Sequence, residues 1–289
     1  MEEKGTQASG TVLVALAAVG WSMAGLFTRL VAGDSWAILG WRGLSSALAI
    51  LAYLLWRERG DLRRPFASMG WLGVVAATVS TLASVAYIPA LLFTIVANVA
   101  VIYATLPFVT AALGWALLRE APAATTLIRA AAAVVGVAIM VGFGGAGGGL
   151  AGIGLAGLMT LGMSLLTIIS RAARGISMIP ATGISAVQLA VIGAAATRLL
   201  DLSVHDILVL GVFGIVQAAA LACYVEGAGR LTAARAALVS TLDVPLAPLW
   251  VLLFVGEIPA AATLIGGTIV LAAVLADIVA LSRTNRRAA

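Results

Sequence analysis

Ten apolar runs of about 20 residues each follow one another along the chain, with short polar segments between them. A helix of 21 residues rises about 31 Å, which is enough to cross the hydrocarbon core of a bilayer. A membrane β-barrel would instead show alternating segments of about 10 residues. The pattern therefore predicts an all-α, polytopic membrane protein. We expect its transmembrane helices at residues 11–31, 36–56, 71–92, 95–118, 123–143, 150–170, 180–200, 206–226, 231–255 and 261–281.

The composition agrees with this pattern and argues against a soluble fold. The chain is 62% hydrophobic and 10% charged, whereas soluble domains are about 25% charged. Its net charge of +5 does not indicate nucleic-acid binding, because the basic residues lie mainly in the segments between apolar runs. The single cysteine, Cys223, permits no intramolecular disulfide. The polar start of the chain lacks the features of a cleaved signal peptide, so we interpret the first run as a retained span.

Basic residues are unequally divided between the two sides of the predicted bundle. If the N-terminus is cytoplasmic, the outer loop edges hold only Arg29 and Arg198. The inner loops and termini then hold Lys4, Arg57, Arg59, Arg63, Arg64, Arg119, Arg171, Arg174, Arg230, Arg283, Arg286 and Arg287. Because basic residues favour the cytoplasmic side, we expect both termini in the cytoplasm.

One segment of nine residues occurs twice, as Glu120–Ile128 and Glu257–Ile265, with seven identical positions and a separation of 137 residues. The repeat predicts two five-helix units, residues 1–143 and 150–289, joined by a glycine-rich linker at 144–149. Five is an odd number, so the second unit would lie inverted in the membrane relative to the first. Inverted repeats of this kind are typical of carriers that work by alternating access.

These features resemble the drug/metabolite transporter superfamily, in its ten-span EamA-type branch. That family has a proline followed by a glutamate at the ends of the fourth and ninth helices. The chain carries this pattern at Pro107 with Glu120, and at Pro245 and Pro248 with Glu257. It departs from the family at Arg119, where a small residue such as Gly256 is usual. The resemblance covers essentially the whole chain and identifies the superfamily better than the substrate.

The resemblance implies a carrier whose substrate cavity lies between the two halves. In general likeness the chain looks most like bacterial amino-acid exporters of the YddG type. This implies export of aromatic or other neutral amino acids, and of related metabolites, across the bacterial inner membrane. Multidrug carriers of the superfamily are half as long and dimeric, so a chain of this length could act as a monomer.

An exchanger of sugar phosphates or of drug-like solutes is the alternative. Sugar phosphates require several cationic groups around the cavity. No lysine lies in a predicted span, and we interpret Arg42 as the only arginine clearly inside one. This scarcity of cationic groups favours zwitterionic or neutral solutes. We also expect the spans to contact membrane lipids.

Asp243 is the sharpest candidate for a functional residue, because it lies near the middle of the ninth span. A carboxylate at that depth costs roughly 2.5–3.5 kcal/mol on insertion scales. It could bind a substrate ammonium group, carry a coupling proton or form a structural ion pair. Arg42, in the outer part of the second span, could meet a substrate carboxylate, pair with Asp243 or extend to the interface.

Other polar and aromatic residues are predicted to lie in the spans. Tyr87 and Tyr224 are related by the repeat and suit an amphipathic substrate, or a place at the lipid interface. Prolines disturb helices, so hinges are predicted at Pro107, Pro245 and Pro248, with static kinks as the alternative. The remaining candidates for the cavity wall are Trp21, Ser22, Asn98, Tyr103 and Ser164.

An intramembrane enzyme and a channel are the competing classes of function. The sequence has no P-loop lysine motif, no serine-hydrolase elbow and no cluster of metal ligands, so no cofactor is predicted. The glycine-rich linker contains G-x-G-x-x-G, but no strand is predicted before it. The single histidine, His205, is expected in an outer loop. The predicted inverted repeat favours a carrier over a channel.

Overall fold

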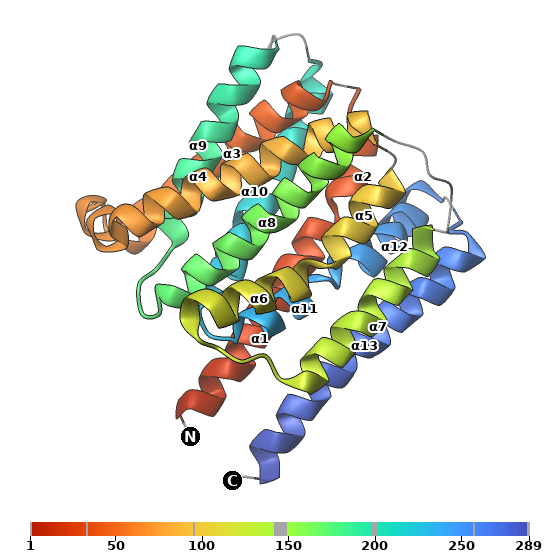
Figure 1. Cartoon of the computed structure of the whole chain (residues 1–289). Helices are drawn as coiled ribbons and strands as arrows, with labels where there is room; N and C mark the ends of the chain where they lie inside the picture. Colours follow the sequence, from red (N-terminus) through yellow and green to blue (C-terminus); the bar gives the residue numbers. More distant parts are fainter. Residues whose placement is uncertain are drawn as a thin grey trace.

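The computed structural model describes residues 2–32, 34–94, 96–141, 149–197, 202–256 and 258–287. Glu257 and most of the predicted linker lie outside these residues. The described residues form α helices and no strand (Figure 1). The helices are α1 (Glu2–Ser22), α2 (Ala24–Arg29), α3 (Ser35–Arg57), α4 (Arg63–Phe93), α5 (Val96–Ala104), α6 (Leu106–Leu118), α7 (Ala124–Val141), α8 (Leu150–Ala172), α9 (Ile179–Ala196), α10 (Val204–Ala228), α11 (Ala233–Ser240), α12 (Asp243–Val255) and α13 (Ala261–Arg287).

These helices supply ten segments that are long and apolar enough to cross a membrane, which confirms the ten predicted spans. Three of the spans are interrupted. The first breaks at Met23 between α1 and α2, the fourth at Thr105 between α5 and α6, and the ninth at Thr241–Leu242 between α11 and α12. A break at membrane depth frees backbone groups, which are tolerated where the backbone is buried in protein or lines a cavity. The breaks therefore mark where a polar interior should be sought.

The third helix differs from its predicted bounds at the start, because α4 begins at Arg63 and not at residue 71. Gly70 has a φ of 56° and a ψ of −157°, so its backbone is not helical. The segment Arg63–Met69 therefore turns away from the rest of α4, and it lies at the left of Figure 1. The left-handed φ at this position is readily accepted by glycine, which has no Cβ.

Helices from the two halves of the chain are interleaved in the bundle. Helix α3 packs along α9, α4 along α8, α7 along α13, and α1 along α10 (Figure 1). Helix α10 also contacts α3, and α9 also contacts α4. The interior is thus shared between the two halves.

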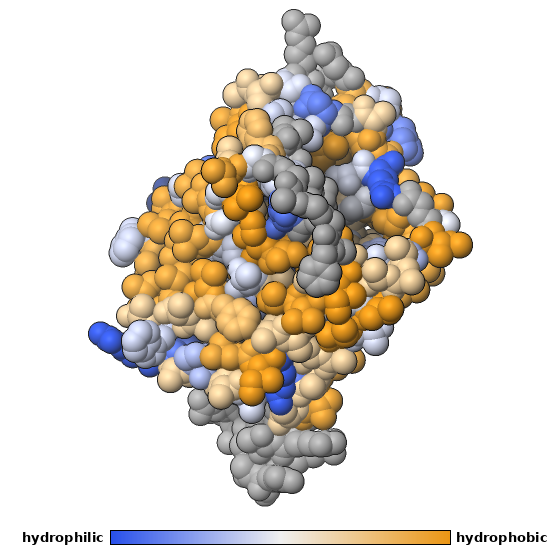
Figure 2. Space-filling model, turned by 45° about the vertical axis from the view of Figure 1, so that its right-hand side comes forward, coloured by the Kyte–Doolittle hydropathy of each residue, from blue (hydrophilic) through white to orange (hydrophobic). Residues whose placement is uncertain are grey.

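The outer surface matches the interior of a membrane. Figure 2 shows a mostly hydrophobic face, with hydrophilic side chains gathered mainly toward the two ends. Exposed apolar side chains are spread over many helices, for example Leu48 on α3, Leu161 on α8 and Val212 on α10. This distribution agrees with a multi-pass membrane protein.

Two pairs of helices approach each other closely at glycines. A Cβ added to Gly193 would lie 2.3 Å from the Cα of Gly40, across the contact between α9 and α3. A Cβ added to Gly136 would lie 2.7 Å from the carbonyl oxygen of Gly266, across the contact between α7 and α13. Small residues allow such close packing between membrane helices.

We expect Gly193→Val to destabilise the protein, because its side chain would meet backbone atoms that cannot move aside. Overpacking of this kind costs about 1–3 kcal/mol. The thermal unfolding midpoint of the purified protein in detergent would fall. Gly211→Val is the matched control, because a Cβ at Gly211 meets nothing within 4 Å. Equal midpoints for the two variants would contradict the close contact at Gly193.

The end of the bundle that holds both chain termini, here called the terminal face, is tied by ion pairs. Arg171 on α8 lies 2.7 Å from a carboxylate oxygen of Glu120, which follows α6. The second carboxylate oxygen of Glu120 accepts a hydrogen bond of 3.4 Å from the backbone N–H of Ala233, at the start of α11. Arg171 also donates to the carbonyl oxygen of Gly229 at 3.3 Å. These contacts join the ends of four spans at the terminal face.

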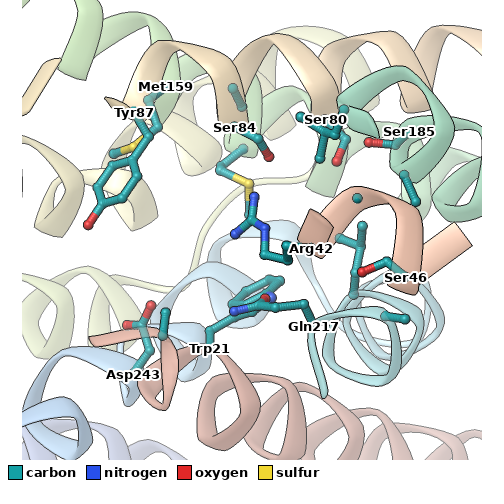
Figure 3. A pocket seen from close by; sticks show the side chains of 18 of the residues that line it. Trp21, Arg42, Ser46, Ser80, Ser84, Tyr87, Met159, Ser185, Gln217 and Asp243 are labelled. Carbon is teal, nitrogen blue, oxygen red and sulfur yellow. The ribbon is translucent and has the colours of Figure 1, made fainter. Parts of the chain in front are cut away.

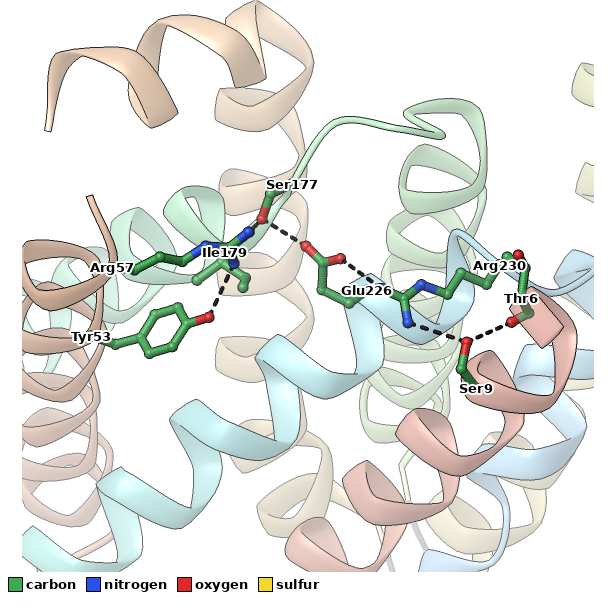
Figure 4. Close-up of polar contacts among 8 residues, drawn as sticks. All are labelled: Thr6, Ser9, Tyr53, Arg57, Ser177, Ile179, Glu226 and Arg230. Atoms are coloured by element: carbon green, nitrogen blue, oxygen red, sulfur yellow. Dashed lines mark hydrogen bonds and ion pairs between the residues drawn. The ribbon is translucent and has the colours of Figure 1, made fainter. Parts of the chain in front are cut away.

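A second polar network on the terminal face is centred on Glu226 of α10 (Figure 4). The Ser177 hydroxyl donates to Glu226 at 2.6 Å, and Arg230 lies 3.6 Å from the other carboxylate oxygen. Arg230 also donates to the hydroxyl of Ser9 on α1 at 3.4 Å. The network therefore links α1, α10 and the connection between α8 and α9.

A buried carboxylate, Asp277 of α13, joins three helices close to the terminal face. Its side chain is only 1% exposed. It lies 2.6 Å from Arg129 of α7 and 2.7 Å from Arg235 of α11. The interpretation of Arg42 as the only arginine clearly inside a span was therefore wrong, because Arg129 and Arg235 also lie within spans. The carboxylate allows these two guanidinium groups to be buried there.

The opposite face is joined by Asp34, which precedes α3. Its carboxylate accepts hydrogen bonds from the backbone N–H groups of Trp36 at 2.7 Å and Ala37 at 3.0 Å, and so caps the helix. It also accepts a hydrogen bond of 2.7 Å from the hydroxyl of Thr197, which follows α9. Partial burial acts to raise the pKa of Asp34, but the bonds from Thr197, Ala37 and Trp36 outweigh it and hold the pKa below its usual value.

This lowered pKa predicts an acid-dependent contribution of Asp34 to stability. A carboxyl group with a lower pKa in the folded state stabilises the fold above its unfolded pKa, and this contribution is lost as the pH falls through the folded pKa. We expect Asp34→Asn to lower the unfolding midpoint slightly at pH 7. The difference from the unmodified protein should shrink as the buffer is acidified below pH ~4. A difference that stays constant over this range would contradict the assignment.

Candidate functional site

A cavity of about 440 Å³ lies among nine of the helices, α1–α5, α8–α10 and α12. Its wall is partly apolar and carries one arginine and one aspartate. The polar and aromatic lining residues are Trp21, Ser22, Arg42, Ser46, Ser80, Ser84, Tyr87, Tyr103, Thr182, Ser185, Gln217 and Asp243. Figure 3 shows ten labelled lining side chains around this space.

The break in the first span forms one side of the cavity. Trp21 and Ser22 end α1 and both line the cavity. The indole N–H of Trp250 on α12 donates to the Ser22 hydroxyl at 2.8 Å, and Ser22 donates to the carbonyl oxygen of Val19 at 2.6 Å. These bonds join the broken ninth span to the end of α1.

Asp243 lines the cavity because it begins a helix at the break in the ninth span. It is the first residue of α12, where the free N–H groups of a helix favour a nearby negative charge. One of its carboxylate oxygens is buried and has no hydrogen-bond partner in the described part of the chain. Asp243 is thus an acceptor that the fold leaves available to the cavity.

Arg42 of α3 is the cation of the cavity wall. Its guanidinium carbon lies 5.6 Å from the ring centre of Phe213, a distance that allows a cation–π interaction. Among the described residues, no carboxylate lies within 4.0 Å of Arg42. Arg42 and Asp243 therefore do not form the direct ion pair that was one of the predicted alternatives. The two opposite charges line the same cavity separately (Figure 3).

Two tyrosines complete the charged region of the cavity. Tyr87 on α4 lines the cavity, and in Figure 3 its hydroxyl end lies on the Asp243 side of Arg42. Tyr103, near the end of α5, also lines the cavity. Both phenols can donate to or accept from a polar ligand.

Three candidates from the sequence are absent from the described cavity wall. Ser164 is fully buried; it accepts a hydrogen bond from the Thr110 hydroxyl on α6 and donates one to the backbone carbonyl oxygen of Thr160, so it joins α8 to α6. Tyr224 is fully buried and bonds to a hydroxyl on α8. Asn98 donates to Thr94 at 2.9 Å, next to the start of α5. All three side chains therefore form hydrogen bonds within the protein, either between helices or to a nearby residue.

Tyr224 supports the wall from behind. Its ring centre lies 4.8 Å from that of Trp21, which does line the cavity. Leu166, Leu238 and Val239 belong to the same buried cluster, and each is no more than 2% exposed. Trp21 packs against this cluster, which therefore supports the cavity wall.

The prolines lie beside the helix breaks. Pro107 is the second residue of α6 and Pro245 the third residue of α12, so neither removes a hydrogen bond from a helix interior. Pro248 lies inside α12 and does remove one.

Helices α6 and α12, the second parts of the two broken spans, also end alike. Arg119 after α6 and Gly256 after α12 both have a left-handed backbone, with φ of 57° and 77°. Arg119 thus takes the conformation that glycine favours at this position.

Comparison with known proteins gives one family match, in the first half of the chain. The sequence profile of the EamA-like transporter family matches residues 8–142. These residues are an EamA-like transporter domain. With the ten candidate spans, the chain is a multi-pass helical membrane protein whose first half carries this match.

Solved structures share the fold of this chain. One crystal structure, described only as that of a protein, superposes with a TM-score of 0.78 and 17% sequence identity. The match covers 93% of this chain and 96% of the other. At this identity the likeness concerns the fold alone. Comparison with curated proteins gave no significant match.

The cavity wall has polar residues that the sequence prediction missed. They are Ser46 on α3, Ser80 and Ser84 on α4, Thr182 and Ser185 on α9, and Gln217 on α10. Ser80, Ser84 and Tyr87 have spacings of four and three residues, so they lie on one face of a helix. This spacing was a usable signal in an otherwise apolar segment. Gln217 is a single amide in an apolar run and had no comparable signal.

Proposed function

We propose that this EamA-like transporter is a secondary carrier that exports zwitterionic amino acids by alternating access. The observation that carries the proposal is the cavity with one arginine and one aspartate that are not paired with each other. An α-amino acid presents one carboxylate and one ammonium group, which are complementary to Arg42 and Asp243. Charge-assisted hydrogen bonds to both would fix its position.

Alternating access is supported by correspondences between the two halves. The first span packs against the eighth as the sixth packs against the third. The fourth and ninth spans break at Thr105 and Leu242, which are separated by the same 137 residues as the sequence repeat. We infer that the halves are inverted repeats and that Pro107, Pro245 and Pro248 begin or bend half-helices that move. The resemblance to YddG-type exporters, which implies export of amino acids, supports the same proposal.

The direction of opening follows from the closed terminal face. Ion pairs of Glu120 and Glu226 tie this face, and Leu166, Leu238 and Tyr224 belong to a buried cluster behind the cavity wall. With both termini in the cytoplasm of a bacterial cell, the conformation described here would be closed to the cytoplasm. Export would then require these ion pairs to open and the opposite face to close.

Transport of sugar phosphates is less well supported by the cavity. Besides Arg42, the described spans bury Arg129 and Arg235, but both lie against Asp277 and outside the cavity wall. The described wall therefore offers a single cation, whereas a phosphate favours several cationic donors. This deficit favours a solute without net charge.

Uptake into proteoliposomes tests the proposal. The purified chain should give saturable uptake of at least one labelled amino acid, with acceleration by the same unlabelled amino acid on the opposite side. Protein-free liposomes are the control, and a pH gradient of either sign tests proton coupling. Absence of saturable uptake across a full amino-acid panel, or counterflow with sugar phosphates only, would overturn the proposal.

A further inference from the structure

We propose that Ser80, Ser84 and Gln217, here called the polar recess, bind the substrate side chain and select amino acids with an uncharged hydroxyl or amide group. The inference rests on the proposed function, because it takes the α-carboxylate and α-ammonium groups to be held by Arg42 and Asp243. The inference goes further than the proposed function, because it states which substrate side chains the cavity selects.

The cavity extends along α4 from a charged part to an uncharged polar part. Ser80 and Tyr87 are seven residues apart, which corresponds to about 10 Å along a helix axis. In the view of Figure 3, Tyr87 and Asp243 lie on one side of Arg42, and Ser80 lies on the other. Ser84 and Gln217 flank Arg42 in the same view. A zwitterionic head bound at the charged part would therefore direct its side chain toward Ser80.

The three side chains of the polar recess are available to a ligand. In the described part of the chain, Ser80, Ser84 and Gln217 make no side-chain hydrogen bond to protein, and all three line the cavity. The neighbouring Thr81 is different, because its hydroxyl bonds to Ser185 at 3.0 Å and to Gln188 at 2.7 Å. Helix α4 thus uses Thr81 to bind α9 and directs Ser80 and Ser84 into the cavity.

Unsatisfied hydroxyl and amide groups discriminate strongly between substrates of the same shape. An apolar side chain would displace water from the polar recess without replacing its hydrogen bonds, whereas a hydroxyl or amide would replace them. Sites built to bond a substrate hydroxyl reject the analogue that lacks it more strongly than apolar pockets reject an extra methylene. Among the described lining residues, Arg42 and Asp243 are the only ones of a charged type, so a charged substrate side chain would lack a partner of its own.

The test compares pairs of similar shape in proteoliposomes. We expect the unmodified chain to prefer L-threonine over L-valine, and L-glutamine over L-methionine, by about tenfold or more in kcat/KM. The double variant Ser80→Ala with Ser84→Ala should lose about tenfold for threonine while valine changes little. Gln217→Leu should reduce the preference for glutamine over methionine. Ser68→Ala is the control, because Ser68 is exposed on the segment before Gly70.

The outcomes separate this inference from the proposed function. Equal transport of threonine and valine, or an equal loss of both in the double variant, overturns the polar recess and leaves an amino-acid carrier. Absence of saturable uptake of any amino acid overturns both. If the double variant does not elute as a single species in gel filtration, Ser84→Ala alone gives the same comparison, because Ser84 is only half-buried.

Discussion

Asp277→Asn should lower the free energy of unfolding by about 3–5 kcal/mol, which is a large effect for a single substitution. The substitution removes the charge that compensates Arg129 and Arg235, which lie 2.6 and 2.7 Å from it. The side chain of Asp277 is 1% exposed, so water cannot take its place. Two guanidinium groups would then face each other in a partly buried site. Denaturant unfolding of the purified protein in detergent measures the change.

A matched control separates burial from loss of charge. Glu58→Gln makes the same change from acid to amide, but Glu58 lies 3.6 Å from Arg57 in a pair whose side chains are 29% and 47% exposed. An exposed pair of this kind contributes about 0–1 kcal/mol. If Asp277→Asn unfolds at the same denaturant concentration as Glu58→Gln, the buried network does not stabilise the fold as described.

Arg42→Gln and Asp243→Asn should each lower kcat/KM for a zwitterionic substrate by about 100-fold. Each removes a charge-assisted hydrogen bond, and a loss of about 3 kcal/mol corresponds to roughly that factor. Both side chains line the cavity without a partner ion among the described residues, so neither should be needed for folding. Initial rates of uptake into proteoliposomes measure the effect.

Substrate analogues separate the two roles. An amino-acid amide lacks the carboxylate, so Arg42→Gln should hardly change its transport. An α-hydroxy acid lacks the ammonium group, so Asp243→Asn should hardly change its transport. If either variant slows every solute to the same degree, the residue acts on the conformational change, and the assigned contact is wrong.

The sequence predicted the helices well, and the reason is physical. Each span needs about 20 apolar residues, and that requirement is visible in a single sequence. Pro107 lies two residues after the break at Thr105 and was a usable signal for it. The break at Met23 was harder to predict, because no proline lies beside it.

The cavity could be predicted in part. Trp21, Arg42 and Asp243 are costly or unusual at membrane depth, and the structure places them on the wall. Ser164 and Tyr224 are as polar as the other candidates, yet their hydroxyls bond to neighbouring side chains. Which direction a hydroxyl faces depends on the rotation of its helix, and a weakly amphipathic membrane helix does not fix that rotation.

The network of Asp277 could not have been derived from spacing. Arg129 and Asp277 are 148 residues apart in sequence, and Arg235 and Asp277 are 42 apart. Only the contact of α7 with α13 and α11 brings them together. Charged residues inside spans are a general sign of such partners, but one sequence does not say which residues pair.

The interleaved packing of the two halves has a consequence for how the protein is made. The ribosome releases the first five spans before the later ones exist, so α3 and α4 enter the bilayer without α9 and α8. Until then Arg42 and Ser80 have no cavity to line, and they face lipid, water or the insertion machinery. Early intermediates of synthesis therefore expose the future transport site, and only the arrival of the second half shields it from the membrane.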